Sequence, residues 1–151
     1  LKKARTLKNL VIDKQIDNRL KPVWCVGTKI QQVFFNIIKN AVEAMAECND
    51  PPDKPRLVLS LSQSKKKAVI TLSDNGPGMD AQTRKHIFDP FYTTKDVRKG
   101  TGLGLSVSYF IIVEDHGGSI EVNSLPGRGA TFIITLPLTR KFHDNLQPEE
   151  P

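Results

Sequence analysis

The sequence is poor in cysteine and has no long hydrophobic run. Cys25 and Cys48 are its only cysteines, and they show neither the spacing of a metal site nor a disulfide framework. We therefore interpret both as ordinary thiols in a reducing cytoplasm. No apolar stretch approaches the roughly 18 residues that span a bilayer, and no signal-peptide pattern occurs. We expect a cytoplasmic domain without direct membrane contact, and any membrane anchor of a longer parent protein would lie outside these 151 residues.

The sequence also lacks a concentrated basic patch, although its net charge is +6. The basic residues are scattered, and the one tight cluster, Lys65, Lys66 and Lys67, falls where a hairpin turn is predicted. A domain that binds nucleic acid usually gathers such charge on one face. The composition, 38% hydrophobic and 25% charged, is that of a soluble globular domain. We therefore expect no nucleic-acid partner.

Hydrophobic periodicity in the first half predicts a strand, a long helix and a hairpin. The strand is predicted at residues 10–17, and the helix begins at Thr28 as N-cap and ends before the Asn-Asp-Pro-Pro run at residues 49–52. Apolar and polar residues alternate at residues 57–62 and 68–73, which predicts two antiparallel strands.

The second half begins with a stretch of weak periodicity. Residues 79–102 are rich in Thr, Lys, Asp and Gly and contain one short helical piece at residues 81–87, so we interpret them as a lid. A helix is predicted at residues 103–115, followed by strands at residues 119–123 and 130–136.

This order of elements predicts an α/β (α+β) fold, a two-layer sandwich. It would hold one mixed, mostly antiparallel sheet with helices on one face. We place the domain at residues 10–138, the end of a preceding helix or linker at residues 1–9, and a polar tail at residues 139–151.

The long helix carries two asparagines one turn apart. Asn36 and Asn40 are spaced so that both side chains point the same way. An amide oxygen is a hard ligand that suits Mg²⁺, which often shares its ligands with substrate phosphates. The alternative, a polar flank of an amphipathic helix, fits the spacing as well.

A sharp turn follows the second hairpin strand. Residues 74–78 read Asp-Asn-Gly-Pro-Gly, and Gly76 and Gly78 permit a close backbone approach. The Asp74 carboxylate could accept a hydrogen bond from an exocyclic amine such as that of adenine. The alternative is a common Asp-Asn-Gly turn with no ligand.

The lid contains aromatic residues beside hydroxyls and a lysine, in the run IFDPFYTTK at residues 87–95. We expect Phe88 and Phe91 to pin the loop to the domain. Thr93, Thr94 and Lys95 would lie nearer the ligand and offer polar groups to phosphate.

A glycine run, GTGLGLS at residues 100–106, leads into the second helix. Glycines before a helix start let backbone N–H groups converge on an anion, and the helix dipole adds to the attraction. A dinucleotide-binding unit would need a strand directly before the run, and the Gly-Lys-Ser/Thr of a P-loop is missing.

The order and spacing of these motifs resemble the GHKL ATP-binding fold, the Bergerat fold, and within it the catalytic domain of sensor histidine kinases. The resemblance covers about residues 10–137 and identifies an N box at Asn36 and Asn40, a G1 box at 74–78, an F box at 88–91 and a G2 box at 100–104. The segments NAVEAM at residues 40–45 and DPFYTTK at residues 89–95 are most similar to histidine kinases of the nitrogen-regulation type.

The resemblance implies ATP and Mg²⁺ as ligands and assigns roles to single residues. Asn40 would ligate Mg²⁺, Asn36 would help to hold the phosphates or metal-bound water, and Asp74 would read the adenine amino group. Asn40 and Lys95 are the expected catalytic residues. The full set expected to bind the cofactor is Asn36, Asn40, Glu43, Ala44, Asp74, Gly76, Gly78, Met79, Phe88, Thr93, Thr94, Lys95, Gly100, Thr101, Gly102, Leu103, Gly104, Leu105 and Thr131.

Two departures from the wider family refine the expected chemistry. Hydrolytic members carry a general-base Glu at the place of Asn36, and an amide cannot take a proton from water, which favours transfer to a protein acceptor. Many histidine kinases have a basic residue at the place of Glu43. The triphosphate must therefore rely more on Lys95, with Lys39, Lys85, Arg98 or Lys99 as further candidates.

The phosphoacceptor of such a kinase is missing from the sequence. His86, His116 and His143 are the only histidines, and none lies in an acceptor-helix motif. The resemblance therefore implies two partners: an acceptor-helix dimerisation domain of the same kinase and a response regulator receiver domain. The isolated domain is expected to be monomeric. A related GHKL serine or other protein kinase, and an ATP-dependent binding module, stay open as alternatives.

Overall fold

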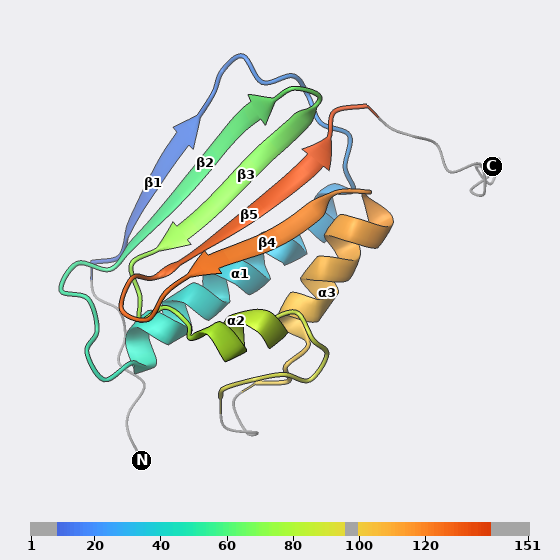
Figure 1. Cartoon of the computed structure of the whole chain (residues 1–151). Coiled ribbons are helices and arrows are strands. Elements are labelled where there is room, and N and C mark those ends of the chain that lie inside the picture. Colours follow the sequence, from blue (N-terminus) through green and yellow to red (C-terminus); the bar gives the residue numbers. More distant parts are fainter. Residues whose placement is uncertain (1–8, 96–99, 140–151) are drawn as a thin grey trace.

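The structure, a computed structural model, describes residues 9–95 and 100–139, and these form two layers. Five strands make one sheet in the order β1-β2-β3-β5-β4 (Figure 1). β1 (Val11–Ile16) pairs in parallel with β2 (Arg56–Ser64), because a helical crossover joins them. The pairs of β2 with β3 (Lys67–Asp74), β3 with β5 (Ala130–Pro137) and β5 with β4 (Ser119–Ser124) are antiparallel. The predicted mixed, mostly antiparallel sheet is confirmed.

The helices form the second layer. α1 (Gly27–Glu47), α2 (Ala81–His86) and α3 (Gly104–Phe110) all lie on one face of the sheet, as expected (Figure 1). α3 continues into η1 (Ile111–Asp115), a π-helical turn, so the helix predicted at residues 103–115 is present but changes its winding at the end. Within the described residues, no helix is long and apolar enough to cross a membrane.

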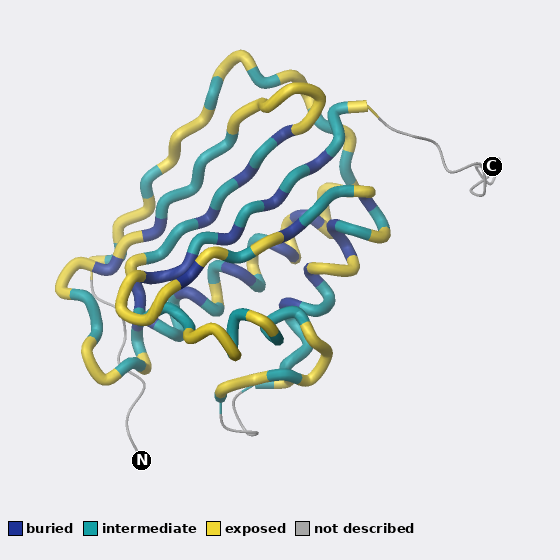
Figure 2. Tube along the Cα trace, in the orientation of Figure 1, coloured by how far each residue is buried: buried dark blue, intermediate teal, exposed yellow. Residues whose placement is uncertain are grey.

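The core lies between the two layers. Strand alternation turns Ala68, Ile70 and Leu72 of β3 toward the helices, where they are buried (Figure 2). Val33 and Ile37 of α1 share the core cluster with Ile70 and Leu72 and are almost inaccessible to solvent. Burying an aliphatic side chain of this size contributes roughly 1.5–3 kcal/mol each, so this seam fixes α1 on the sheet.

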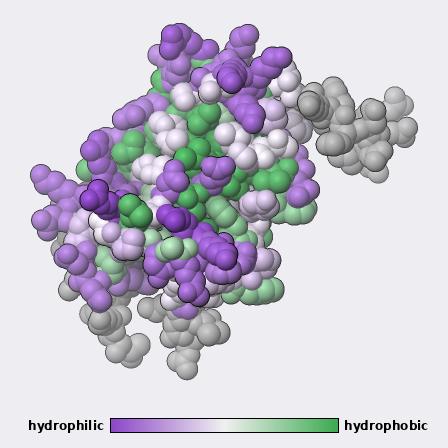
Figure 3. Space-filling view, in the orientation of Figure 1, coloured by the Kyte–Doolittle hydropathy of each residue, from purple (hydrophilic) through white to green (hydrophobic). Residues whose placement is uncertain are grey.

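The other face of the sheet carries no helix. Figure 3 views the molecule from this side, where polar and apolar side chains intermingle on the surface. Hydroxyl groups pair across neighbouring strands here, in the pairs Ser60–Thr71, Ser73–Thr131 and Ser119–Thr135. Cross-strand pairs of this kind stabilise a sheet without extending its core.

The start of α1 corrects one prediction. The helix begins at Gly27 with Val26 as N-cap, so Thr28 lies inside the first turn and does not cap it. The Val26 N–H donates instead to Nε2 of His116, at 3.0 Å, and the other ring nitrogen of His116 lies 2.7 Å from the carbonyl oxygen of Ile111. A buried histidine from the far end of α3 and η1 therefore positions α1, a contact that local sequence could not reveal.

The expected chain ends cannot be compared in full. The preceding helix or linker predicted at residues 1–9 and the tail predicted at 139–151 lie almost wholly outside the described residues. Two further expectations concern cysteine and lysine. Cys25 and Cys48 are free thiols. Lys65 and Lys66 form the hairpin turn and Lys67 begins β3, and all three lysines are exposed.

Candidate nucleotide-binding site

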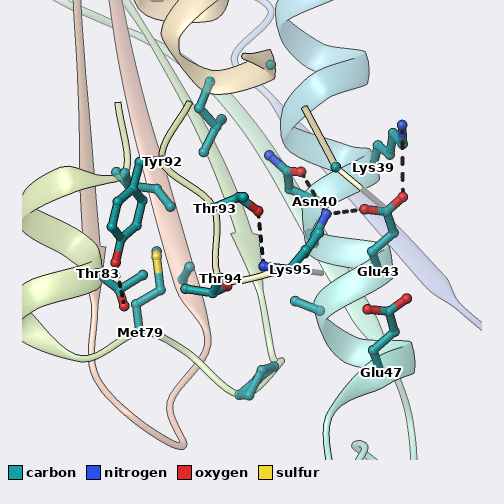
Figure 4. Close-up of a pocket in the computed structure, with 18 of the residues that line it drawn as sticks. Lys39, Asn40, Glu43, Glu47, Met79, Thr83, Tyr92, Thr93, Thr94 and Lys95 are labelled. Carbon is teal, nitrogen blue, oxygen red and sulfur yellow. Dashed lines mark hydrogen bonds and ion pairs between the residues drawn. The ribbon is translucent and has the colours of Figure 1, made fainter. Parts of the chain in front are cut away.

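A cavity of about 660 Å³ opens between α1, the loops around α2 and the ends of β3 and β5. Its size lies within the range of small-molecule sites. α1 forms one wall with Asn36, Asn40 and Glu43, and Met79, Thr83 and Tyr92 lie across from it (Figure 4). The glycine run supplies part of the remaining wall. The four sequence motifs, which are far apart in the chain, therefore meet at one cavity.

Asn36, the first asparagine of α1, makes two hydrogen bonds that join elements of the fold. The amide nitrogen of Asn36 donates to the carbonyl oxygen of Gly104, at 2.9 Å, and to the hydroxyl of Ser108, at 3.2 Å. These bonds fasten α1 to the start of α3, which is where the glycine run ends. Asn36 thus lines the cavity and also holds the two elements that frame it.

Asp74 lies at the end of β3, where the strand enters its turn. Its Oδ1 accepts hydrogen bonds from the N–H of Gly76, at 2.8 Å, and of Ala130, at 3.3 Å. Partial burial raises the pKa of the Asp74 carboxyl, because desolvation penalises the charged form, and the two hydrogen bonds oppose that shift. Because both bonds use Oδ1, the second oxygen of the carboxylate is the one that can accept from a ligand amine.

The turn after Asp74 interlocks with the turn between β4 and β5. Gly78 has φ +69°, and a Cβ there would lie 2.0 Å from the carbonyl oxygen of Leu125. Gly129 has φ +68°, and its Cβ would lie 1.9 Å from the carbonyl oxygen of Asp74. The backbone N–H of Gly129 also donates to the carbonyl of Gly76, at 3.0 Å. The turn after Asp74 and the turn between β4 and β5 therefore hold each other in place, and they hold Asp74 with them.

The segment after α2 corrects another prediction. Phe88 packs between Tyr109 and Phe132, with ring centroids 5.8 and 6.2 Å away, and pins the loop as expected. Phe91 does not pin it, because its side chain is 74% exposed. The backbone makes the contact instead: the N–H of Phe91 donates to the carbonyl of Gly102, and Phe91 adopts φ +64°. Gly102 suits this position because its absent Cβ would lie 2.6 Å from the Phe91 backbone.

A lysine from the lid reaches across the cavity to α1. Lys95 Nζ forms an ion pair with Glu43 and donates to Oδ1 of Asn40, at 3.4 Å (Figure 4). Lys39 stands on the other side of Glu43, with 4.0 Å between Nζ and Oε1. The stem of Lys95 lies against Gly100, at ordinary contact distance from where a Cβ would be. Lys95 and Lys39, two of the cations considered for neutralising phosphate, therefore lie at the cavity, and the Glu43 carboxylate lies between them.

Most of the residues predicted for the site line the cavity. They are Asn36, Asn40, Glu43, Ala44, Asp74, Gly78, Met79, Thr93, Thr94, Lys95, Gly100, Thr101, Gly102, Gly104 and Leu105.

Four predicted site residues lie outside the lining: Gly76, Phe88, Leu103 and Thr131. The Thr131 hydroxyl shares a hydrogen bond with the Ser73 hydroxyl on the open face of the sheet. Strand alternation points the Thr131 side chain to that face and the adjacent side chains of β5 to the other. Ala130 and Phe132, which alternate with it, are the β5 residues at the cavity. Gly76 and Phe88 support the lining from behind.

Sequence reasoning missed several lining residues. Glu47 follows Glu43 by one helical turn, so helical spacing could have found it. The others are Ala41, Cys48, Pro77, Asp80, Thr83, Ile87, Tyr92, Ala130 and Phe132. Among the further cations considered, Lys39 lines the cavity and Lys85 does not, while Arg98 and Lys99 lie outside the described residues.

The histidines in the described part of the chain have structural surroundings. His86 pairs with Asp89 on the surface, and His116 is buried at the end of η1. His143 lies outside the described residues.

The donor set of the cavity fits a hard divalent cation shared with a ligand. Asn40 offers an amide oxygen, and Glu43 offers a carboxylate one turn further along α1. Within the described residues, no group of three or more His, Cys, Asp or Glu could hold a metal ion without help.

Comparison with known proteins places this fold and this cavity in a family. Residues 25–140 match the family described as histidine kinase-, DNA gyrase B-, and HSP90-like ATPase. The chain belongs to this family. It is 38% identical to sporulation kinase E of Bacillus subtilis (strain 168) over 144 residues, which is 95% of this chain and 18% of that kinase. The sensory histidine kinase/phosphatase NtrB of Rhizobium leguminosarum bv. phaseoli is 37% identical over 146 residues, 88% of this chain and 36% of NtrB.

Solved structures give the same result. The catalytic domain of histidine kinase ThkA has a TM-score of 0.73 and 32% identity, and the match covers 87% of this chain and 82% of that domain. ThkA has also been solved in complex with the response regulator protein TrrA, with a TM-score of 0.69, 29% identity and 35% of that chain covered. The predicted GHKL fold and the likeness to histidine kinases, including the nitrogen-regulation NtrB, are confirmed. The chain spans about a fifth to a third of the curated relatives that it matches.

Proposed function

We propose that this chain is the ATP-binding catalytic domain of a two-component sensor histidine kinase. It would hold ATP so that the γ-phosphoryl passes to a histidine on a dimerisation domain outside this chain. The observation that carries the proposal is the convergence of Asn40, Asp74, Lys95 and the glycine run on one cavity. Membership of the family supports ATP as the ligand.

The two ends of the cavity suit the two ends of a nucleotide. Asp74, Gly78 and Met79 would form the base end, where the free carboxylate oxygen accepts from the adenine amine. Asn40, Lys95 and the backbone N–H groups at residues 100–105 would form the phosphate end. Phosphoryl transfer needs mainly positioning and charge neutralisation, and these groups supply both.

A bound Mg²⁺ would supply further neutralisation of the phosphates. Asn40 would hold it, since its amide oxygen lines the cavity. The place of a hydrolytic general base is taken by Asn36, whose amide is bonded to Gly104 and Ser108. This favours transfer to a protein acceptor over hydrolysis.

The proposed partners follow from the same function. The acceptor would be the acceptor-helix dimerisation domain of the same kinase, because neither of the described histidines lines the cavity. The next acceptor would be a response regulator receiver domain, and ThkA in complex with TrrA supports this. We propose that the domain works in the cytoplasm.

Nucleotide affinity of an Asn40 variant tests the proposal. Asn40→Ala should weaken ATP binding about tenfold or more in Mg²⁺ and change it little in EDTA, because one hydrogen bond or ligand to a charged group is worth roughly 1.5–3 kcal/mol. Calorimetric titration of both proteins with ATP measures this. Asn123→Ala, at an exposed position on β4, is the control and should bind as the parent does. Equal Mg²⁺-dependent affinity for Asn40→Ala and the parent would show that the metal assignment is wrong.

A further inference from the structure

Glu43 places a negative charge in a cavity that is expected to bind an anion. Its side chain is only 30% exposed, and Lys95, its partner, is 24% exposed. The two residues are 52 positions apart in sequence, so their contact joins the lid to α1 rather than two turns of one helix. Its contact with Lys39 is a long helical i,i+4 pair with an exposed lysine and contributes little.

The Lys95 ammonium cannot pair fully with the Glu43 carboxylate and with a triphosphate at the same time. In the structure, its ammonium pairs with Glu43 and lies 3.4 Å from Oδ1 of Asn40. When Lys95 turns to a phosphate, Glu43 loses its partner. An unpaired carboxylate beside a triphosphate, in a partly buried cavity, is repelled by it. The repulsion disappears only if a second cation replaces the lysine.

We propose that Glu43 makes nucleotide binding by this domain depend on a divalent cation. Lys95 holds the cation's place in the ligand-free protein. On binding, Lys95 moves to the phosphates, and the oxygens of Asn40 and Glu43 accept the divalent cation that arrives with the nucleotide. A nucleotide without a cation must leave Glu43 unpaired and binds weakly. This inference rests on the proposed function and adds that Glu43 selects the metal-bound form of the nucleotide.

The test is ADP affinity in excess MgCl₂ and in EDTA, measured by calorimetry for the whole chain and its variants. The ratio of the dissociation constant in EDTA to that in MgCl₂ should be large for the parent. Glu43→Gln should lower that ratio about tenfold or more, chiefly by tightening ADP binding in EDTA. Glu43→Asp keeps the charge and should restore most of the ratio. Glu121→Gln removes an exposed carboxylate on β4 and should leave both constants unchanged.

A second variant separates the exchange of Lys95 from simple repulsion. Lys95→Met should weaken ADP binding in both solutions. In the Lys95→Met background, Glu43→Gln should gain less affinity in EDTA than in the parent, because no ion pair is left to break. Circular dichroism of each variant confirms that it folds.

Two results would overturn the inference. One is a Glu43→Gln protein whose ratio of dissociation constants equals the parent's, and the other is a Glu43→Gln protein that binds ADP in EDTA no more tightly than the parent does. Failure of the parent to bind ADP in either solution would instead overturn the proposed function, and the inference with it.

Discussion

At the scale of single residues, the proposed role of Asp74 in binding adenine opposes its contribution to stability. Burial raises its pKa, so the native state holds the proton more tightly than the unfolded chain does. Ionisation therefore costs stability as the pH rises from the unfolded value, 3.8, through the native value. The cost is absent below the unfolded value and complete once the pH exceeds the native value. A protein keeps such a residue where its charge is used.

Asp74→Asn should separate the two effects. At pH 7 the variant should be at least as stable as the parent, because an amide oxygen can still accept from Gly76 and Ala130 and carries no charge to desolvate. Near pH 3 the difference in melting temperature should vanish. ATP affinity should fall about tenfold or more, as roughly 1.5–3 kcal/mol is lost with a charged hydrogen bond. Thermal unfolding at both pH values and an ATP titration check this. A variant that binds ATP as the parent does would contradict the role of Asp74.

The interlocked turns allow a matched pair of glycine substitutions. Gly129→Ala should destabilise the domain by about 2–4 kcal/mol, because it combines positive φ with a Cβ that overlaps the Asp74 carbonyl. Gly127→Ala has a similar φ, +75°, but no atom within 4 Å of its Cβ, and should cost only about 1–2 kcal/mol. Urea unfolding of both variants measures the difference. Equal losses would show that the contact between the turns does not matter.

At the scale of elements, His116 joins the start of α1 to the end of η1. Both of its ring nitrogens are engaged, one by the Val26 N–H and one by the Ile111 carbonyl. His116→Ala should remove both of these hydrogen bonds and cost about 1–3 kcal/mol. His86→Ala removes a surface pair with Asp89 and should cost less than about 1 kcal/mol. Chemical denaturation compares them, and similar small losses would contradict the positioning of α1 by His116.

The same contact shows what local sequence can and cannot predict. The apolar spacing of α1 and the alternation in β2 and β3 predicted those elements, because their periods report burial on one face. The start of α1 at Gly27 depends on His116, 90 positions away from Val26. The outward side chain of Phe91 depends on its backbone contact with Gly102. Such tertiary contacts override local capping and hydrophobic preference.

The candidate site also combines residues that sequence motifs predicted with contacts that only the folded chain reveals. Residues on α1, at the β3 turn and in the glycine run were found from their motifs, and the structure brings them to one cavity. Thr131 was placed by resemblance, and strand alternation turns it to the open face instead. The bond of Asn36 to Gly104 and the pairing of Lys95 with Glu43 join distant segments, so no spacing within the sequence indicated them.

At the scale of the whole molecule, the described part of the chain brings no histidine to the cavity. A two-layer domain surrounds one nucleotide-sized cavity, while His86 is held by Asp89 at the surface and His116 is buried under α1. The domain should therefore bind ATP as a monomer and incorporate no phosphate without a partner. Sedimentation of the isolated chain, with and without ATP, checks the first part of this expectation.

Phosphoryl transfer in trans tests the central claim most directly. The chain would be mixed with the separately produced acceptor-helix domain of its parent kinase and with ATP labelled at the γ-phosphate. We predict label on that domain, lost in acid as phosphohistidine is and stable in alkali, and none on this chain alone. If the acceptor domain carried no label, or an acid-stable phosphoserine, this chain would not be the catalytic domain of a histidine kinase.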